Sequence, residues 1–183
     1  FVIGFAIYVM QIRLVPIGFV FNRFPRMIRD LAKQQKKIIH LQMEGGDIEL
    51  DRLLIDEIGE SITHLIRNSI DHGLETSEVR KKTAKSIHGT IYLRASRSKE
   101  TAIIEISDDG AGLDLQQIKN LAVKHQLLKP EASLEEASNI IFSGLSTTKH
   151  ATAISGRGLG LSIVKQKIES IGGTVQVKTT LNK

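Results

Sequence analysis

The chain has 183 residues, and its 25 Lys and Arg residues outnumber its 20 Asp and Glu residues, which gives a net charge of +5. This length is enough to bury a core, and 41% hydrophobic with 25% charged residues is typical of a globular domain rather than a disordered chain. The modest charge excess does not indicate a nucleic-acid-binding protein. The absence of cysteine excludes disulfides, thiolate metal sites and cysteine nucleophiles, and it fits a reducing, cytoplasmic location.

The first ten residues are apolar, but a membrane-spanning helix needs about 20 such residues, and the flanking pattern of a signal peptide is missing. We therefore predict neither a membrane span nor an export signal. Six of the eight aromatic residues lie within the first 24 positions. This concentration predicts that residues 1–36, broken by Pro16 and Pro25, pack against a partner helix or a second subunit rather than on the main core.

Further along the chain, alternating apolar residues predict four strands, the second and third joined by a hairpin turn at 98–100. They lie at 39–43, 91–95, 102–106 and 175–177. Residues 51–72 have helical periodicity, with Gly59 expected to divide them into two helices and Gly73 to end them.

Three more helices are predicted at 114–126, 133–142 and 159–171. Asp114 is the expected N-cap of the first, and Ser133 and Glu136 form a capping box at the start of the second. The order of elements lacks regular βαβ alternation. It predicts an α/β fold, a two-layer sandwich in which helices cover one face of a mixed, largely antiparallel sheet.

Three groups of residues are suited to chemistry, although each has an ordinary structural explanation. The first is on the helix, where His64, Asn68 and Asp71 or His72 recur on one face. The amide oxygen of an Asn is a suitable ligand for Mg²⁺. A solvated polar face that ends in a helix cap would explain the same pattern.

The second group is the loop Asp108-Asp-Gly110-Ala-Gly112, which follows a strand. Its carboxylate could accept a hydrogen bond from a flat ligand that the glycines allow to approach, but many strand-to-helix loops have this composition. The third group is the start of the last helix, where Gly156, Gly158 and Gly160 follow a small, polar stretch. Glycines at a helix N-terminus suit phosphate binding, yet the spacing is that of neither a P-loop nor a Rossmann fingerprint.

The order and spacing of the three groups resemble the GHKL ATP-binding superfamily, which includes histidine kinases, type II topoisomerases, mismatch-repair ATPases and related chaperones. Within it the sequence is most similar to the CheA family of chemotaxis histidine kinases, in the segments 64–75, 107–114, 140–147 and 155–158. The resemblance implies a Bergerat-type sandwich with an ATP lid.

The resemblance also implies a division of the chain. Residues 12–17 and 21–26 resemble the end of the CheA dimerisation hairpin and its junction with the kinase domain. Residues 1–36 would then be the end of a dimerisation helix and a linker, and residues 37–183 the ATP-binding kinase domain. Because the sequence stops at Lys183, we expect it to lack a last strand beside 174–179.

The same resemblance assigns roles to single residues. Asn68 would ligate the magnesium that bridges the ATP phosphates, and His64 stands where hydrolytic members have a glutamate. The implied catalytic residues are His64, Arg67, Asn68 and His72. Asp71 and His72 would lie near the phosphates.

At the other end of the nucleotide, Asp108 would accept a hydrogen bond from the adenine amine, with Gly110 and Gly112 shaping its surroundings. The remaining nucleotide contacts are assigned to the helix after this loop, the lid and the glycine-rich helix start. They are Lys119, Lys124, Thr147, Thr148, Ser155, Gly156, Arg157, Gly158, Leu159 and Gly160.

None of the six histidines is followed by Glu, as it would be in the acceptor helix of ordinary sensor kinases. We therefore expect the phosphorylated histidine to lie on a separate phosphotransfer domain. The resemblance further implies response regulators downstream, receptor-coupling proteins and chemoreceptors as partners, and a homodimer of the full-length protein.

Two other functions stay open at this point. One is a GHKL ATPase in which lid closure drives dimerisation, although such an enzyme would carry a glutamate in place of His64. The other is a module that binds nucleotide without chemistry, or a dimerising scaffold, which the altered glycine-rich helix start permits.

Overall fold

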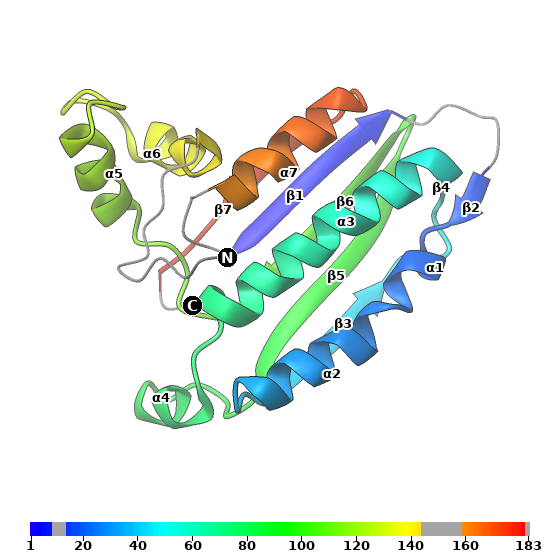
Figure 1. The fold of residues 1–183 in the computed structure, drawn as a ribbon, viewed down its shortest axis with the longest axis horizontal. Coiled ribbons are helices and arrows are strands. Elements are labelled where there is room, and N and C mark those ends of the chain that lie inside the picture. Colours follow the sequence, from blue (N-terminus) through cyan, green and yellow to red (C-terminus); the bar gives the residue numbers. More distant parts are fainter. Residues whose placement is uncertain (9–13, 144–158, 182–183) are drawn as a thin grey trace.

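One layer of the molecule is a five-stranded sheet, and the other is a set of helices that cover one face of it (Figure 1). The computed structural model describes residues 1–8, 14–143 and 159–181. The strands of the sheet are β1 (Val2–Tyr8), β3 (Ile39–Glu44), β5 (Gly89–Ser98), β6 (Thr101–Asp108) and β7 (Thr174–Lys178). Two short strands, β2 (Leu14–Pro16) and β4 (Glu49–Asp51), pair with each other.

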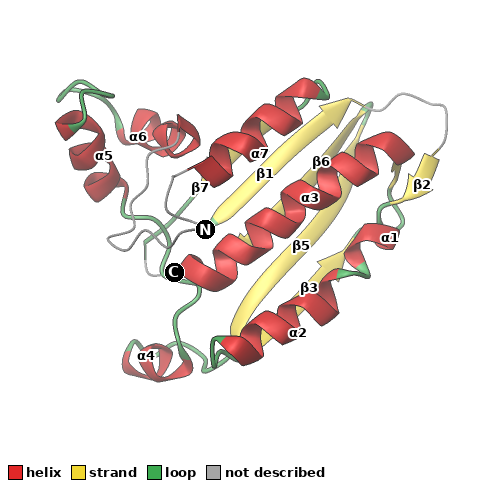
Figure 2. Ribbon diagram, viewed as in Figure 1, coloured by secondary structure: helices red, strands yellow, loops and turns green. Residues whose placement is uncertain are grey.

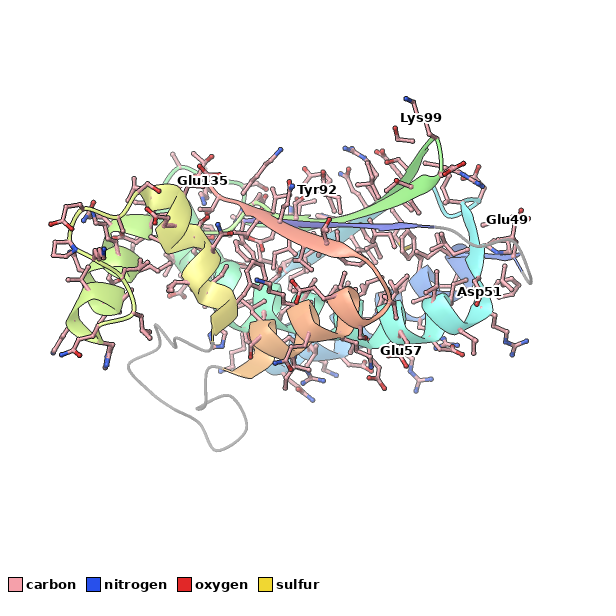
Figure 3. The ribbon with its side chains drawn as sticks, turned by 90° about the horizontal axis from the view of Figure 1, so that it is seen from above. Glu49, Asp51, Glu57, Tyr92, Lys99 and Glu135 are labelled. Atoms are coloured by element: carbon pink, nitrogen blue, oxygen red, sulfur yellow. The ribbon has the colours of Figure 1, made fainter. Side chains whose placement is uncertain are left out.

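The order across the sheet is β3-β5-β6-β1-β7. Only the pair β3 and β5 is parallel, and the other three pairs are antiparallel. The prediction of a mixed, largely antiparallel sheet is therefore confirmed. The predicted hairpin is present as well, with Lys99 at its tip in a left-handed conformation (φ 55°) (Figure 3).

Seven α-helices are described, and two irregular turns continue α3 and α6. They are α1 (Gly18–Phe21), α2 (Phe24–Gln34), α3 (Arg52–Asn68), the π-helical turn η1 (Ser69–Gly73), α4 (Ser77–Lys82), α5 (Leu115–Lys124), α6 (Leu134–Ile140), the 3₁₀ turn η2 (Ile141–Ser143) and α7 (Leu159–Ser170). Helices α2, α3 and α7 lie on one face of the sheet (Figure 2). In the view turned by 90°, Tyr92 lies on the opposite, uncovered face (Figure 3).

The predicted helix caps are confirmed. The Asp114 carboxylate accepts a hydrogen bond from the Gln117 amide at the start of α5 (2.8 Å). Ser133 and Glu136 form the reciprocal capping box of α6. These caps satisfy amide groups that have no partner inside the helix, which explains why short polar signals located the helix starts correctly.

The predicted break at Gly59 is wrong, because α3 continues from Arg52 to Asn68. A Cβ atom at Gly59 would lie 3.4 Å from Cγ1 of Val20 in α1, which is ordinary van der Waals contact. Ile58 and Ile62 are fully buried beside it. Their packing outweighs the cost of about 1 kcal/mol that a glycine brings to a helix interior.

The expectation that residues 1–36 pack outside the main core is also wrong. Residues 2–8 form a strand between β6 and β7, and Ile3 and Phe5 are buried in the core cluster together with Phe21 and Phe24. Alternate apolar positions of β1 face the helices, which is the pattern of a strand with one buried face. The division of the chain at residue 36 and its role in dimerisation stay predictions.

One edge of β7 pairs with β1, and the further strand expected beside 174–179 stays a prediction. Val2 to Ala6 pair with Lys178 to Thr174, so one edge of β7 is covered. β7 is the last strand of the sheet, and its other edge has no partner strand among the described residues.

We expect Phe5→Ala to lower the free energy of unfolding by about 3–5 kcal/mol, because it removes a large side chain that is 2% exposed. Phe19→Ala is the matched control, since Phe19 is 64% exposed, and its effect should stay within about 0.5 kcal/mol. Urea denaturation followed by circular dichroism measures both. Equal, small effects would show that β1 is not part of the stable sheet.

Candidate functional site

The candidate site is built around the Asp108 carboxylate, at the end of β6. This residue is buried, and its Oδ1 atom accepts a hydrogen bond from the Gly110 amide (3.1 Å). The Ser69 side chain lies close enough to affect the pKa of the carboxyl, and the Phe1 amine lies 3.8 Å from Oδ1. Within the described residues, Oδ2 is buried and has no partner. A buried oxygen without a partner is an acceptor available to a ligand.

Burial raises the pKa of the Asp108 carboxyl, against the opposing effects of the Phe1 amine and of the hydrogen bonds from Ser69 and Gly110. Removing a carboxylate from water disfavours its charged form. The ionised Asp108 is therefore held at a cost to stability.

Three glycines bring backbone close to this carboxylate. A Cβ at Gly73 would lie 3.0 Å from Asp108 Oδ2, and one at Gly110 would lie 2.1 Å from the Gly73 carbonyl oxygen. Gly112 has a positive φ (71°), and a Cβ there would lie 2.4 Å from the Thr180 carbonyl oxygen. Side chains at these positions would therefore collide with backbone or with the carboxylate, which explains the glycine pattern of the loop.

Helix α3 brings the second half of the site to the same place. Asn68 is its last residue, and the next residue, Ser69, contacts Asp108. From there the chain continues as a π-helical turn, closed by a hydrogen bond from the Leu74 amide to the Ser69 carbonyl (2.7 Å). Such turns are frequent at functional sites because they change the direction in which side chains point. The end of this turn approaches the Asp108 carboxylate at Gly73, and the role of Asn68 stays a prediction.

His64 lies one helical turn before Asn68 and is half-buried. Its Nε2 atom is buried and has no partner among the residues described. Burial lowers the pKa of His64, and the charge of Arg67 lowers it further, against the opposing charge of Asp71. The imidazole is therefore neutral at physiological pH.

The exposed residues Arg67, Asp71 and His72 lie at the same helix end. The Gln35 amide donates to Asp71, and the Lys37 ammonium donates to the Ile70 carbonyl, so the end of α2 holds the π-helical turn in place. Five of the predicted residues lie on α3 and the turn that continues it: His64, Arg67, Asn68, Asp71 and His72. That turn approaches Asp108 at Gly73.

Other predicted residues are not joined to this group. Lys119 is half-buried and Lys124 is exposed on α5, and none of the hydrogen bonds or ion pairs among the described residues links either to Asn68 or Asp108. Leu159 and Gly160 begin α7. The remaining lid and glycine-rich positions lie outside the described residues: Thr147, Thr148, Ser155, Gly156, Arg157 and Gly158.

Sequence reasoning missed four charged residues that hold the Asp108 loop: Glu75, Arg80, Lys85 and Asp109. Arg80 and Lys85 bind the loop across 24 to 29 positions of sequence. A pairing over that distance leaves no local pattern. The one available signal was that Glu75 and Asp109 fall inside motifs already recognised, without a role of their own.

Among the described residues, no group of three or more His, Cys, Asp or Glu side chains could hold a metal ion. A magnesium ion at this site would therefore depend on the Asn68 amide oxygen and on ligand phosphates, which is a usual arrangement for this ion. No helix within residues 1–8, 14–143 and 159–181 combines the length and hydropathy that a membrane span requires.

We expect Asp108→Asn to raise the melting temperature of the ligand-free protein near pH 7, by about 2–4 °C for each kcal/mol of burial cost removed. The ionised form is destabilising only where the unfolded chain is ionised, so the gain should shrink as the pH falls toward the ordinary carboxyl pKa of 3.8. Differential scanning calorimetry across this range measures it. The exposed Asp47→Asn is the control, and a drop in melting temperature at neutral pH would contradict the prediction.

Comparison with known proteins identifies the family. Residues 55–183 match the family model described as histidine kinase-, DNA gyrase B-, and HSP90-like ATPase. This range contains every predicted site residue, from His64 to Gly160.

Two relatives are chemotaxis proteins CheA. The chain is 42% identical over 178 residues to the one from Treponema pallidum, covering 96% of this chain and 22% of that protein. It is 46% identical over 176 residues to the one from Bacillus subtilis, covering 93% of this chain and 26% of that protein. The chain thus spans only about a quarter of the length of these relatives.

Solved structures confirm the fold. The Acinetobacter baumannii histidine kinase AdeS superimposes with a TM-score of 0.56 at 17% identity, over 93% of this chain and 61% of that one. The histidine kinase domain from the Erythrobacter litoralis EL346 blue-light activated histidine kinase gives 0.51 at 15% identity, over 92% and 57%. The predicted sandwich and the resemblance to the GHKL superfamily are confirmed, and the chain belongs to the histidine kinase-, DNA gyrase B- and HSP90-like ATPase family.

Proposed function

We propose that this chain is the ATP-binding domain of a chemotaxis histidine kinase, which transfers the γ-phosphoryl group of ATP to a histidine on a separate phosphotransfer domain. The reaction forms a phosphorus–nitrogen bond and releases ADP. The similarity to CheA proteins over most of the chain supports the assignment to this class.

The observation that carries the proposal is the buried Oδ2 atom of Asp108, which has no partner among the described residues and lies beside the end of α3. A base with an exocyclic amine would supply the missing donor. The same helix end presents Asn68, so one ligand could meet a carboxylate at its base and an amide at its phosphates. Phosphoryl transfer depends mainly on such positioning and on charge stabilisation.

Asn68 would hold magnesium through its amide oxygen, because its side chain makes no capping hydrogen bond to the turn that follows and an amide oxygen suits this ion. When bound, magnesium neutralises charge on the phosphate oxygens. Arg67 and His72, both exposed at this helix end, would border the phosphates, Arg67 with its positive charge and His72 with a ring N–H donor.

His64 favours transfer over hydrolysis in this proposal. Its imidazole is half-buried and neutral, and it stands where hydrolytic members of the superfamily carry a glutamate. A carboxylate polarises water strongly. The half-buried imidazole of His64 would polarise water less, so water would compete less with the acceptor histidine for the phosphoryl group. The acceptor would then be a histidine brought by another domain.

The wider setting is part of the same proposal. A histidine phosphotransfer domain would be the substrate, and response regulators would receive the phosphoryl group in turn. Receptor-coupling proteins, chemoreceptors and a second copy of the full-length protein would be the other partners, in the cytoplasm.

We expect Asn68→Ala to reduce magnesium-dependent transfer by at least about 100-fold, because it removes the one amide placed to hold the metal. The measurement uses radiolabelled ATP and the isolated phosphotransfer domain of a CheA protein as acceptor. Asn139→Ala, an exposed Asn near the end of α6, is the matched control and should transfer normally. Normal transfer by a folded Asn68→Ala variant would refute the role of Asn68.

The same assay separates the other functions. Label on the acceptor supports the kinase. Release of free phosphate alone would indicate an ATPase instead of a kinase. Nucleotide binding without either product would indicate a scaffold.

We further expect Asp108→Asn to weaken ATP binding by about 1–3 kcal/mol, the cost of impairing a buried hydrogen bond to a charged group. Isothermal titration calorimetry measures the affinity, with Asp47→Asn as control. An unchanged affinity for ATP would show that Asp108 does not bind the nucleotide.

A further inference from the structure

A buried ion cluster lies behind the Asp108 loop, and we name it the Arg80 cluster after its central residue. It consists of Glu75, Arg80, Lys85 and Asp109. Arg80, on α4, is only 1% exposed. Its Nη1 donates to Glu75 Oε2 (3.0 Å) and its Nη2 to Asp109 Oδ2 (2.9 Å). Its Nε donates to the Ser86 carbonyl (2.6 Å), so all three guanidinium nitrogens are used.

Both cations also bind backbone of the Asp108 loop. The Arg80 Nη1 atom donates to the Asp109 carbonyl (3.1 Å). The Lys85 ammonium donates to the Asp109 carbonyl (3.2 Å) and to the Gly110 carbonyl (2.7 Å), and its third hydrogen bond goes to Glu75 Oε1 (3.0 Å). The carbonyl groups of Asp109 and Gly110 are therefore held by the buried Arg80 and the half-buried Lys85.

The hydrogen bonds from Arg80 and Lys85 hold the backbone segment that hydrogen-bonds Asp108. The Gly110 amide, between the two held carbonyls, donates to Asp108 Oδ1. On the other side, the Thr90 amide donates to Asp109 Oδ1 (2.8 Å), which ties the loop to β5. With the loop fixed in this way, one Asp108 oxygen is satisfied by the protein and the other is left for a ligand.

The surroundings of Glu75 favour its charged form. Although burial alone would raise it, the pKa of Glu75 is lowered by the hydrogen bond from Lys85 and by the charges of Lys85 and Arg80. Burying such charges is costly, and apolar residues of similar volume often stabilise a fold equally well. Stability alone therefore does not account for four charges at this place.

We propose that Arg80 and Lys85 are positioning residues that set the affinity of the site for the adenine amine, by fixing the Asp109–Gly110 backbone so that Asp108 Oδ2 stays available. The inference rests on the proposed function, because it takes the amine as the donor to Asp108. It goes further by giving a role in base recognition to residues that do not touch the base.

The test compares two nucleotides that differ only in this donor: ATP and purine riboside 5′-triphosphate, which lacks the exocyclic amine. The ratio of their dissociation constants measures the hydrogen bond to Asp108. Lys85→Met removes the ammonium while keeping the aliphatic chain. We expect it to reduce the ratio by about tenfold, mainly by weakening ATP, whereas Lys85→Arg restores it.

Lys167→Met is the matched control, because Lys167 also bridges two carboxylates, those of Glu57 and Glu60, and has a similar side-chain exposure (23% against 15% for Lys85). It should leave the ratio unchanged. Arg80→Lys is the second variant, since a lysine cannot reach Glu75, Ser86 and Asp109 together, and it should also lower the ratio. In an Asp108→Asn background, Lys85→Met should have no further effect on the ratio, because Lys85 acts through Asp108.

Two results would overturn the proposal. One is an unchanged ratio in folded Lys85→Met and Arg80→Lys proteins. The other is an equal loss of affinity for both nucleotides, which would indicate support of the whole fold rather than of base recognition. Failure of the proposed function is distinguishable, because the wild-type protein would then show no preference for ATP at all.

Discussion

The arrangement of the site follows from the burial of one carboxylate, Asp108, whose hydrogen bonds the protein only partly satisfies. Asp108 sits at the end of β6, where its charge is disfavoured and its Oδ2 atom lacks a donor among the described residues. Such a group is costly unless a ligand completes its hydrogen bonds. The hydrogen bond from the Gly110 amide to Oδ1 reduces that cost and leaves Oδ2 as a free acceptor.

Both halves of the site depend on this constraint. The π-helical turn continues α3, and it approaches the Asp108 carboxylate at Gly73. The end of α2 holds this turn through Gln35 and Lys37. Under the proposed function, stability and ligand binding would be opposed at Asp108, a trade-off that is common at binding sites.

Local patterns predicted most of the fold. The hairpin at 98–100 and the caps at Asp114 and Ser133 depend on neighbours in sequence, and they are correct. The helix break predicted at Gly59 was wrong because burial of the surrounding apolar residues outweighs the low helix propensity of glycine. The motifs located the end of α3 and the end of β6 correctly, and the roles of His64, Asn68 and Asp108 stay predictions. Arg80 and Lys85 were missed because their partners are distant in sequence.

The position of β1 has a consequence for how the protein folds. Its neighbours are β6 and β7, so residue 2 meets residues 107 and 178. Contacts between such distant segments must close long loops, and they slow folding in proportion to that separation. Until residues 174–178 are in place, the apolar strand β1 lacks one of its two neighbours, and an unpaired strand edge of this kind favours misassembly.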